Sequence, residues 1–363
     1  MALINGKVLT REEILRRVGD ISQLGGVRSF EYNDGPEKGV RAVEVNSGGG
    51  LSYTVLVDRG MDLASTFYKG VSLSWRSATG NLAPSFFEPA KLGWLRGFHG
   101  GLMNTCGLSY AGAPGIDKST LLFLDEEEFG LHGRASYIPA SNVYADGLWQ
   151  GDDYLITVSG KVKEAVVFGD KLVLFRKIFT RLGEKSILIE DEVINEGWQD
   201  TPCMLLYHIN VGYPILDEGS EYLVPVEKTV ARDAQAADGE AEWNRFHAPQ
   251  KEYFEKVYLH TPRTLADGNG AALLLNQTME LGFYAKFNTD ALPYLTQWKM
   301  LGEGEYVLGI EPGNCFPLGR KAERGAGRLV VLKPGQSWKV RLELGVVDGT
   351  AEIAQFRKYM GLA

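Results

Sequence analysis

Short runs of alternating or continuous apolar residues dominate the chain, and these runs predict β-strands. Between residues 27 and 75 the runs are separated by Asn-Asp-Gly-Pro, Ser-Gly-Gly-Gly and Arg-Gly, which are turn sequences. Three further runs over residues 153–195 are joined by Gly-containing turns and predict a β-meander, and residues 272–347 hold another group. The pattern therefore predicts an all-β fold, a large antiparallel β-sandwich.

Helical patterns are confined to the two ends of the chain. Residues 10–18 predict a short helix, because Thr10 can cap its N-terminus and apolar residues recur on one face. Another short helix is expected near residues 350–360. We expect one sandwich domain over residues 1–363, with residues 1–26 as an N-terminal helical extension.

Two segments break the strand pattern. Residues 76–120 are rich in Gly, Pro, Ser and aromatic residues but show little periodicity, and long irregular stretches in compact domains are often functional. Residues 226–270 are polar, and their Ala/Asp/Glu-rich part at 233–242 predicts an exposed excursion.

Composition supports many turns between aromatic-rich strands. The chain has 44 Gly in 363 residues, with 16 Tyr, 16 Phe and 7 Trp, whereas ordinary proteins contain about 7% Gly. The net charge of −8 and the lack of a basic cluster argue against nucleic acid as a partner. No apolar run suits a membrane span or a signal peptide, and three scattered cysteines favour reduced thiols. These features predict a cytoplasmic protein without a membrane partner.

Two histidines and one glutamate are the main candidates for chemistry. His208 lies in the apolar run that follows Asn195-Glu196-Gly197, His132 lies in Gly-Leu-His-Gly, and Glu311 lies in Gly-Ile-Glu-Pro. Each has an ordinary structural alternative: a core histidine, a surface turn histidine, and a carboxylate that holds a backbone amide. Together, two imidazoles and one strand carboxylate could form a general acid/base pair with a substrate-holding partner.

The order and context of these motifs resemble the aldose 1-epimerase (galactose mutarotase-like) family, which interconverts the anomers of sugars. The resemblance covers most of residues 120–347, including a closing segment at 329–344 similar to the family's terminal hairpin. It implies that Glu311 is the general base, that His208 is the general acid, and that His132 binds substrate hydroxyls. It also implies a galactose mutarotase-like sandwich, a monosaccharide or sugar derivative as partner, and no cofactor.

The chain departs from the family in an early element that normally carries a sugar-binding Arg. Its counterpart at residues 100–108 has Asn104 but no Arg, which puts galactose or glucose in doubt as the substrate. Nearby segments resemble a divergent bacterial branch of mutarotase-like proteins, and they add Arg59, Asp62 and His99 as candidate substrate-binding residues. The alternatives are a structural Arg/Asp pair and a histidine that packs a loop.

A third group of candidates precedes Glu311 by one hairpin. In Pro-Tyr-Leu-Thr-Gln-Trp-Lys, Trp298 could stack on a sugar face, and Gln297 and Lys299 could bind its hydroxyls. Sandwich-core packing explains the same residues without a ligand. We also expect burial to raise the basicity of Glu311, and neighbouring acids to keep His208 protonated near neutral pH.

Other classes of site lack sequence support. No His-x-x-x-His or paired-Cys spacing predicts a metal site, and neither the P-loop nor the nucleophile-elbow motif occurs. The function that the family resemblance implies, aldose 1-epimerase, is the favoured one. The alternatives are a non-catalytic carbohydrate-binding protein on the same fold, or a glycosidase or lyase in which Asp62 or Asp290 is paired with Glu311.

Overall fold

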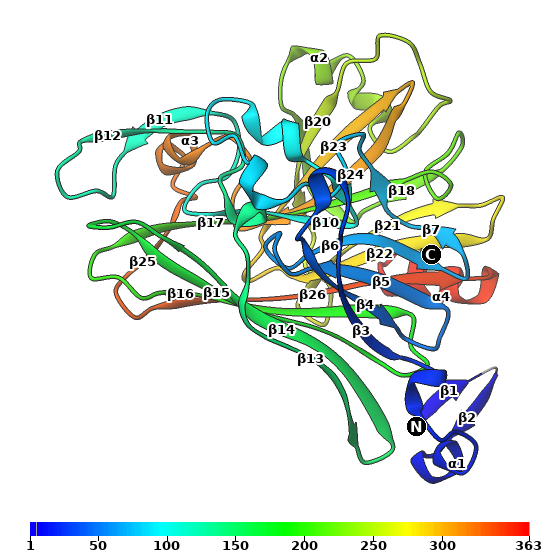
Figure 1. Cartoon of the computed structure of the whole chain (residues 1–363). Helices are drawn as coiled ribbons and strands as arrows, with labels where there is room; N and C mark the ends of the chain where they lie inside the picture. Colours follow the sequence, from blue (N-terminus) through cyan, green and yellow to red (C-terminus); the bar gives the residue numbers. More distant parts are fainter. Residues whose placement is uncertain (5, 363) are drawn as a thin grey trace.

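The computed structural model describes residues 1–4 and 6–362, and β-strands make up most of its regular structure (Figure 1). Two large sheets, antiparallel between neighbouring strands, pack against each other, and the helices are short and peripheral. The predicted all-β sandwich is confirmed. The predicted meander over residues 153–195 is also present, as three consecutive long strands of one sheet.

The larger sheet contains the strands that position the candidate site. Its order is β19 (Val226–Ala231), β20 (Lys256–Pro262), β23 (Tyr294–Gly302), β24 (Glu305–Gly313), β17 (Thr201–Gly212), β10 (Met103–Leu108), β6 (Asp62–Tyr68), β5 (Leu51–Leu56), β4 (Arg41–Asn46) and β3 (Gly26–Glu31), with β25 (Val330–Leu332) beside β17 and β7 (Val71–Ser72) beside β6. β17 lies in the middle and is buried along its whole length.

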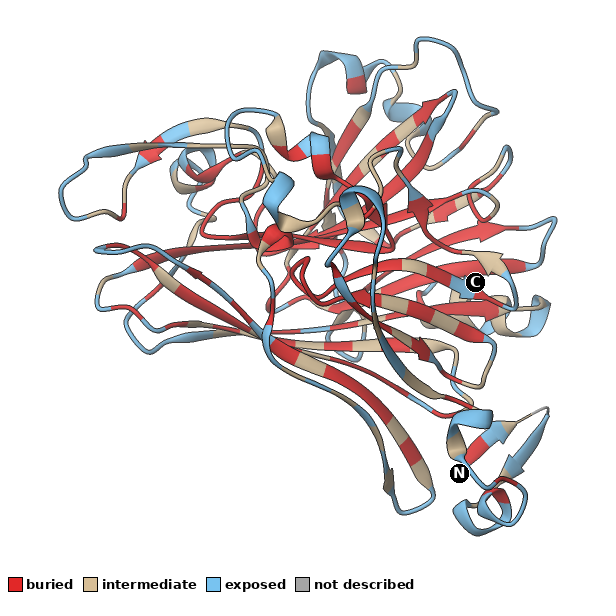
Figure 2. Ribbon diagram, viewed as in Figure 1, coloured by how far each residue is buried: buried red, intermediate tan, exposed pale blue. Residues whose placement is uncertain are grey.

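The second sheet covers one face of the first. Its order is β13 (Ser141–Gln150), β14 (Asp153–Ala165), β15 (Lys171–Arg181), β16 (Ser186–Asn195), β26 (Ser337–Asp348), β22 (Leu281–Asn288), β21 (Asn269–Asn276) and β18 (Glu221–Leu223). Figure 2 shows that burial is concentrated in the strands of both sheets, whereas many of the peripheral loops are exposed.

Alternation along the strands assigns each side chain to a face of the larger sheet. Ile209 of β17 and Ile310 of β24 join the apolar core between the two sheets, together with Val158 and Ile189 from the second sheet. Their neighbours in sequence therefore point to the opposite face. There Leu206 and other apolar residues form a separate, aromatic-rich cluster under the irregular segment 76–120.

The smaller elements surround these sheets. Among the described residues, the helices are α1 (Arg11–Leu15), α2 (Ala234–Ala237), α3 (Arg320–Gly325) and α4 (Thr350–Tyr359), and the two-stranded sheets are β1 (Ala2–Ile4) with β2 (Lys7–Leu9), β8 (Trp75–Arg76) with β9 (Gly100–Gly101), and β11 (Gly115–Lys118) with β12 (Glu126–Phe129). In that part of the chain, no helix is long and apolar enough to cross a membrane.

The N-terminal segment agrees only partly with its prediction as a helical extension. Thr10 caps α1 as expected, and the Glu13 side chain bonds back to the Thr10 amide in a capping box. A β-hairpin of β1 and β2 precedes this helix. Each of its strands has three residues, which is too short for the sequence pattern to predict a strand. The single-domain organisation stays a prediction, which the continuous core between the sheets supports.

Candidate active site

The outer face of the larger sheet forms the floor of a cavity of about 700 Å³. His208 on β17 and Glu311 on β24 lie on adjacent strands, on the face opposite the core. His132 reaches the same cavity from the loop that follows β12. The structure therefore brings together the three residues singled out by the sequence motifs.

His208 and Glu311 are in direct contact. His208 Nε2 lies 3.2 Å from Glu311 Oε1, and both side chains are almost completely buried. On the other side of the ring, His208 Nδ1 lies 2.6 Å from Asn210 Oδ1. The Asn210 amide nitrogen donates to the carbonyls of His208 and Gly101, which fixes the amide so that its oxygen accepts from Nδ1–H. Nε2 is thus the nitrogen that exchanges a proton with Glu311.

Burial controls the protonation of this pair. It lowers the pKa of His208 to about 4, against a smaller raising effect of the Asn210 hydrogen bond. It raises the pKa of Glu311 well above its usual value, with a further upward contribution from Glu255. The expectation that neighbouring acids keep His208 protonated near neutral pH is therefore wrong. The carboxylate in contact with its ring, that of Glu311, is itself pushed toward the neutral form by burial.

His132 is held in an unusual backbone conformation. Its φ of 57° lies in the left-handed region, and Gly133 continues the turn at φ 74°. A Cβ on Gly133 would lie 2.2 Å from the carbonyl oxygen of Tyr110, so only Gly fits this approach. Burial lowers the pKa of His132 to about 3, and its Nδ1 has no hydrogen-bond partner among the described residues. The imidazole is thus neutral, and the residue lines the cavity.

Aromatic side chains enclose the pair. The rings of Phe98, Trp298 and Trp94 lie 5.1, 5.4 and 6.4 Å from the His208 ring, and all three line the cavity. Trp94 Nε1 and Thr296 Oγ1 are buried without partners in the described part of the chain. Aromatic faces with a few unsatisfied polar atoms suit a ligand with both C–H faces and hydroxyl groups, such as a sugar.

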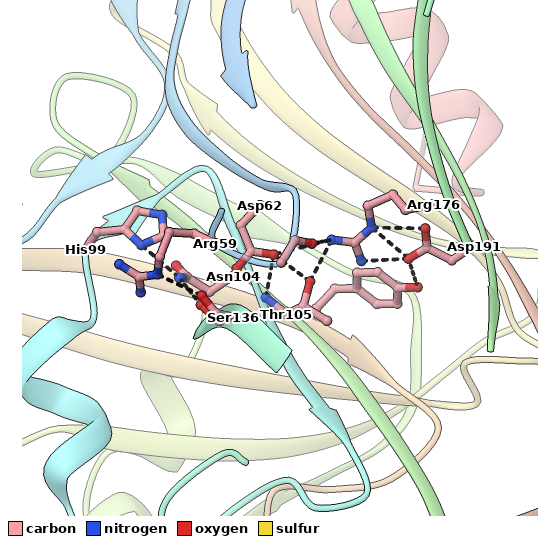
Figure 3. A network of polar contacts seen from close by, with 10 residues as sticks. Arg59, Asp62, His99, Asn104, Thr105, Ser136, Arg176 and Asp191 are labelled. Carbon is pink, nitrogen blue, oxygen red and sulfur yellow. Dashed lines mark hydrogen bonds and ion pairs between the residues drawn. The ribbon is translucent and has the colours of Figure 1, made fainter. Parts of the chain in front are cut away.

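Four other predicted substrate-binding residues lie outside the cavity, in buried polar contacts (Figure 3). Arg59 donates to the carbonyls of Ser136, Leu82 and Gly97. Asn104 is the strand neighbour of His208, but its amide is covered by His99 Nδ1 at 3.1 Å and Ser136 Oγ at 3.3 Å. These contacts hold the loops above the sheet. Arg59, His99 and Asn104 therefore have structural roles, as the alternative interpretation of the sequence proposed.

Asp62 belongs to a network that joins the two sheets. Its Oδ1 accepts from the Thr105 amide and hydroxyl, and lies 3.3 Å from Arg176 Nη1. Arg176 in turn makes a two-pronged contact with Asp191, which also accepts from the Tyr207 hydroxyl (Figure 3). Asp62 therefore has a structural partner, although the predicted Arg59 is not that partner.

Gln297 and Lys299 also face away from the cavity. Side chains alternate along β23, so Thr296 and Trp298 line the cavity while Gln297 and Lys299 point to the other face. Gln297 donates to the carbonyl of Trp243, and Lys299 donates to those of Glu242 and Arg245. Instead of binding a ligand, they anchor the excursion between β19 and β20.

That excursion supplies cavity residues that the sequence did not reveal. Arg232 and Glu255, at its two ends, line the cavity, as do Trp75 from β8 and Trp94 from the irregular segment 76–120. The length and irregularity of segment 76–120 indicated a functional region, but they did not show which of its residues point into the cavity. Asp290, the alternative glycosidase partner of Glu311, does not line the cavity. No cluster of His, Cys, Asp and Glu within residues 1–4 and 6–362 could hold a metal ion.

A comparison with protein-family models identifies the family of the chain. The sequence model of a family described as a domain of unknown function (DUF4432) matches residues 37–346. The chain belongs to the DUF4432 family. No curated protein matches the chain.

Solved structures relate this DUF4432 protein to mutarotase-like folds. A "putative aldose 1-epimerase" from Klebsiella pneumoniae has 27% identity and a TM-score of 0.86, over 94% of this chain and 90% of that one. A galactose mutarotase-like protein from Clostridium acetobutylicum has 14% identity and a TM-score of 0.63, covering 90% and 99%. A galactose 1-epimerase from Lactobacillus acidophilus has 13% identity and a TM-score of 0.58, covering 89% and 99%. The expected galactose mutarotase-like sandwich, in a divergent branch, is thus confirmed.

Proposed function

We propose that this protein is an aldose 1-epimerase in which Glu311 and His208 exchange protons with the hemiacetal of a sugar. The observation that carries the proposal is the 3.2 Å contact between His208 Nε2 and Glu311 Oε1 at the floor of the cavity. The two oxygens of a hemiacetal are bonded to one carbon, so the groups that serve them must be neighbours. Similarity to structures described as aldose and galactose 1-epimerases supports the same reaction.

The pair carries one transferable proton in this proposal. In the empty site it resides on Glu311, because burial raises the pKa of the carboxyl and lowers that of His208. When a sugar binds, its O1–H donates to Glu311 and favours the carboxylate, and the proton passes to His208 Nε2. Glu311 is then the base, His208 is the acid, and Asn210 stabilises the imidazolium through Nδ1–H.

Ring opening then needs two proton transfers. Glu311 accepts the O1 proton, the C1–O5 bond breaks, and His208 Nε2 gives its proton to O5. Rotation about C1–C2 presents the other face of the carbonyl. Return of the O5 proton to Nε2, attack of O5 on C1, and donation from Glu311 to O1 close the ring as the other anomer, with both residues restored.

His132 and the aromatic walls orient the sugar during this exchange. The neutral imidazole of His132 lines the cavity and binds a hydroxyl, and the rings around His208 exclude water from the transferring protons. Excluding water strengthens the electrostatic effect of each charge that develops in the reaction.

Exchange spectroscopy by NMR, with a panel of free sugars, tests the proposal. We expect the purified protein to accelerate interconversion of the anomers of at least one sugar, and the Glu311→Gln variant to lose that acceleration. Sugar binding without acceleration would contradict the proposal and favour the non-catalytic carbohydrate-binding alternative. Hydrolysis of a chromogenic glycoside would point to a glycosidase instead.

A further inference from the structure

The cavity extends well beyond the His208–Glu311 pair. It is also lined by Glu305, which lies six residues before Glu311 on the same strand, a distance of roughly 20 Å at the rise of a β-strand. Arg232 lies at the end of β19, three strands away from β24, or about 14 Å across the sheet. A single pyranose ring held at Glu311 covers only part of this span.

The pair lies at a closed end of the cavity. Two loops meet beyond Glu311, where the Ala113 amide donates to the Pro317 carbonyl at 3.2 Å and Gly112 pairs with Leu318. Ala113, Pro317 and Leu318 line the cavity here, and His132 is tied to the same loops through a bond from its amide to Gly112. A sugar whose anomeric centre contacts Glu311 can therefore be extended only toward the opposite end.

Away from these loops, on the side toward β20, the cavity combines an aromatic platform with polar groups. Trp298 lies between the two ends, and its Nε1 donates to Glu255 at 2.8 Å. Glu255 is 46% exposed and lies 3.0 Å from Arg232, which also contacts Asp233 at 2.8 Å. An indole face beside an ion pair with free donor and acceptor capacity suits the C–H face and hydroxyls of another sugar ring.

The charges at this end select against an anionic extension. Arg232 is the single cation lining the cavity within the described residues, and Asp233 and Glu255 both neutralise it. Glu305, further along β24, adds another carboxylate to the cavity lining. A phosphate or uronate would thus meet a net negative surface and would have to displace existing ion pairs.

We propose that the natural substrate is the reducing end of an uncharged oligosaccharide of at least two sugar units. This inference rests on the proposed function, because the reducing unit must present its free anomeric centre to Glu311 and His208. The second unit stacks on Trp298 and bonds to the Arg232–Glu255 pair. Its binding energy holds the reducing unit against the pair and increases kcat/KM.

Anomer exchange of glucose, maltose, cellobiose, lactose and glucose 6-phosphate, measured by NMR, tests the substrate length. We expect kcat/KM for at least one disaccharide to exceed that for glucose by about tenfold or more, as one stacked and hydrogen-bonded ring would supply. Equal kcat/KM for glucose and all three disaccharides, or a preference for glucose 6-phosphate, would overturn the inference while leaving the proposed function intact.

Substitution at the far end gives an independent test. Arg232→Ala should reduce kcat/KM for the preferred disaccharide by about tenfold, and reduce that for glucose much less. The matched control is Arg28→Ala, which removes an exposed arginine paired with Glu44 elsewhere on the protein. Equal losses for disaccharide and glucose would contradict a second sugar position.

Direct binding separates the two proposals. The intrinsic tryptophan fluorescence, to which the cavity residues Trp75, Trp94 and Trp298 contribute, reports occupancy whether or not exchange occurs. Tighter binding of a disaccharide than of glucose, without any anomer exchange, would overturn the proposed function and retain the two-unit site. Exchange with equal affinity for glucose and every disaccharide would overturn the two-unit site alone.

Discussion

Two groups of buried charged residues lie on opposite faces of the same sheet, and they differ in what surrounds their charged atoms. Between the sheets, Arg176 is held by Asp191, Asp62 and Thr105, all from the protein itself. On the outer face, Glu311 has His208 beside a large cavity. The first group is a structural connection between the sheets. The second lies beside open space that a ligand can enter.

The comparison shows that burial of a charge is not by itself a sign of function. Burial raises the pKa of Asp62 and the pKa of Glu311 alike. What separates them is the direction in which each strand presents its side chain, together with the open volume beside it. Substitutions in the two groups should therefore have opposite consequences, one mainly for catalysis and the other mainly for stability.

The largest effect is expected from Glu311→Gln, which keeps the shape of the side chain and removes the base. Anomer exchange should fall by about 10²- to 10⁴-fold, as for loss of a positioned proton-transfer group. His208→Asn should act similarly, and the double variant should be little worse, because the two residues act in one step. Thermal unfolding should stay near that of the original protein. Retained exchange in Glu311→Gln would exclude this pair as the catalytic one.

Arg176→Met should affect the other group. It leaves the buried Asp191 and Asp62 without their cation, so the free energy of unfolding should fall by about 3–5 kcal/mol. Urea denaturation measures this loss, and exchange per folded molecule should change little. The matched control, Arg341→Met, removes an arginine that is 79% exposed and should cost less than about 1 kcal/mol. Equal losses in the two variants would remove the structural role assigned to the network.

His132→Asn should produce an intermediate effect on catalysis. Asn tolerates the left-handed φ of 57° at this position, so the turn should persist while the imidazole is lost. Loss of one hydrogen bond to the sugar should increase KM about five- to tenfold, with a smaller change in kcat. Steady-state kinetics with the best sugar of the panel distinguish the two parameters. An unchanged KM would show that His132 only shapes the loop.

The smallest effect concerns pH. Because the pKa of His208 is lowered to about 4, the imidazole is neutral above that pH and the pair holds its single proton. Exchange should therefore be nearly constant from neutral pH down to about pH 5 and be halved near pH 4. Circular dichroism must confirm folding, because the lowered pKa means that stability is also lost as pH falls toward 4. Loss of exchange already near pH 6.5 would contradict the assignment.

The features that depend on local sequence patterns were predicted correctly. Strand alternation and turn residues predicted the sandwich, and three short motifs identified residues that the fold brings to one cavity. The direction of individual side chains was predicted less well. Gln297 and Lys299 flank Trp298 in sequence, yet a strand directs them to the opposite face. The motif alone could not show which of the alternating residues point outward.

Long-range contacts explain the other differences. Nothing near Asn104 in sequence indicates that Ser136 covers its amide, or that Arg176 is the partner of Asp62. The protonation of His208 was predicted wrongly for the same reason, since the enclosing rings come from segments on either side of it in the chain. Cavity residues such as Trp94 lie in an irregular loop whose path depends on these contacts.

The division of the cavity between strands and loops has a consequence for how such proteins diverge. Strand residues form the floor, and a Cβ at Gly309 would lie 2.7 Å from the Glu311 carboxylate and 2.8 Å from Trp298, so even Ala there would displace the base. The walls come from loops, which tolerate insertions and replacements far better than a central strand does. New ligand preferences can therefore arise by exchange of the 76–120 and 232–255 segments, while the His208–Glu311 pair is inherited unchanged with the sheet.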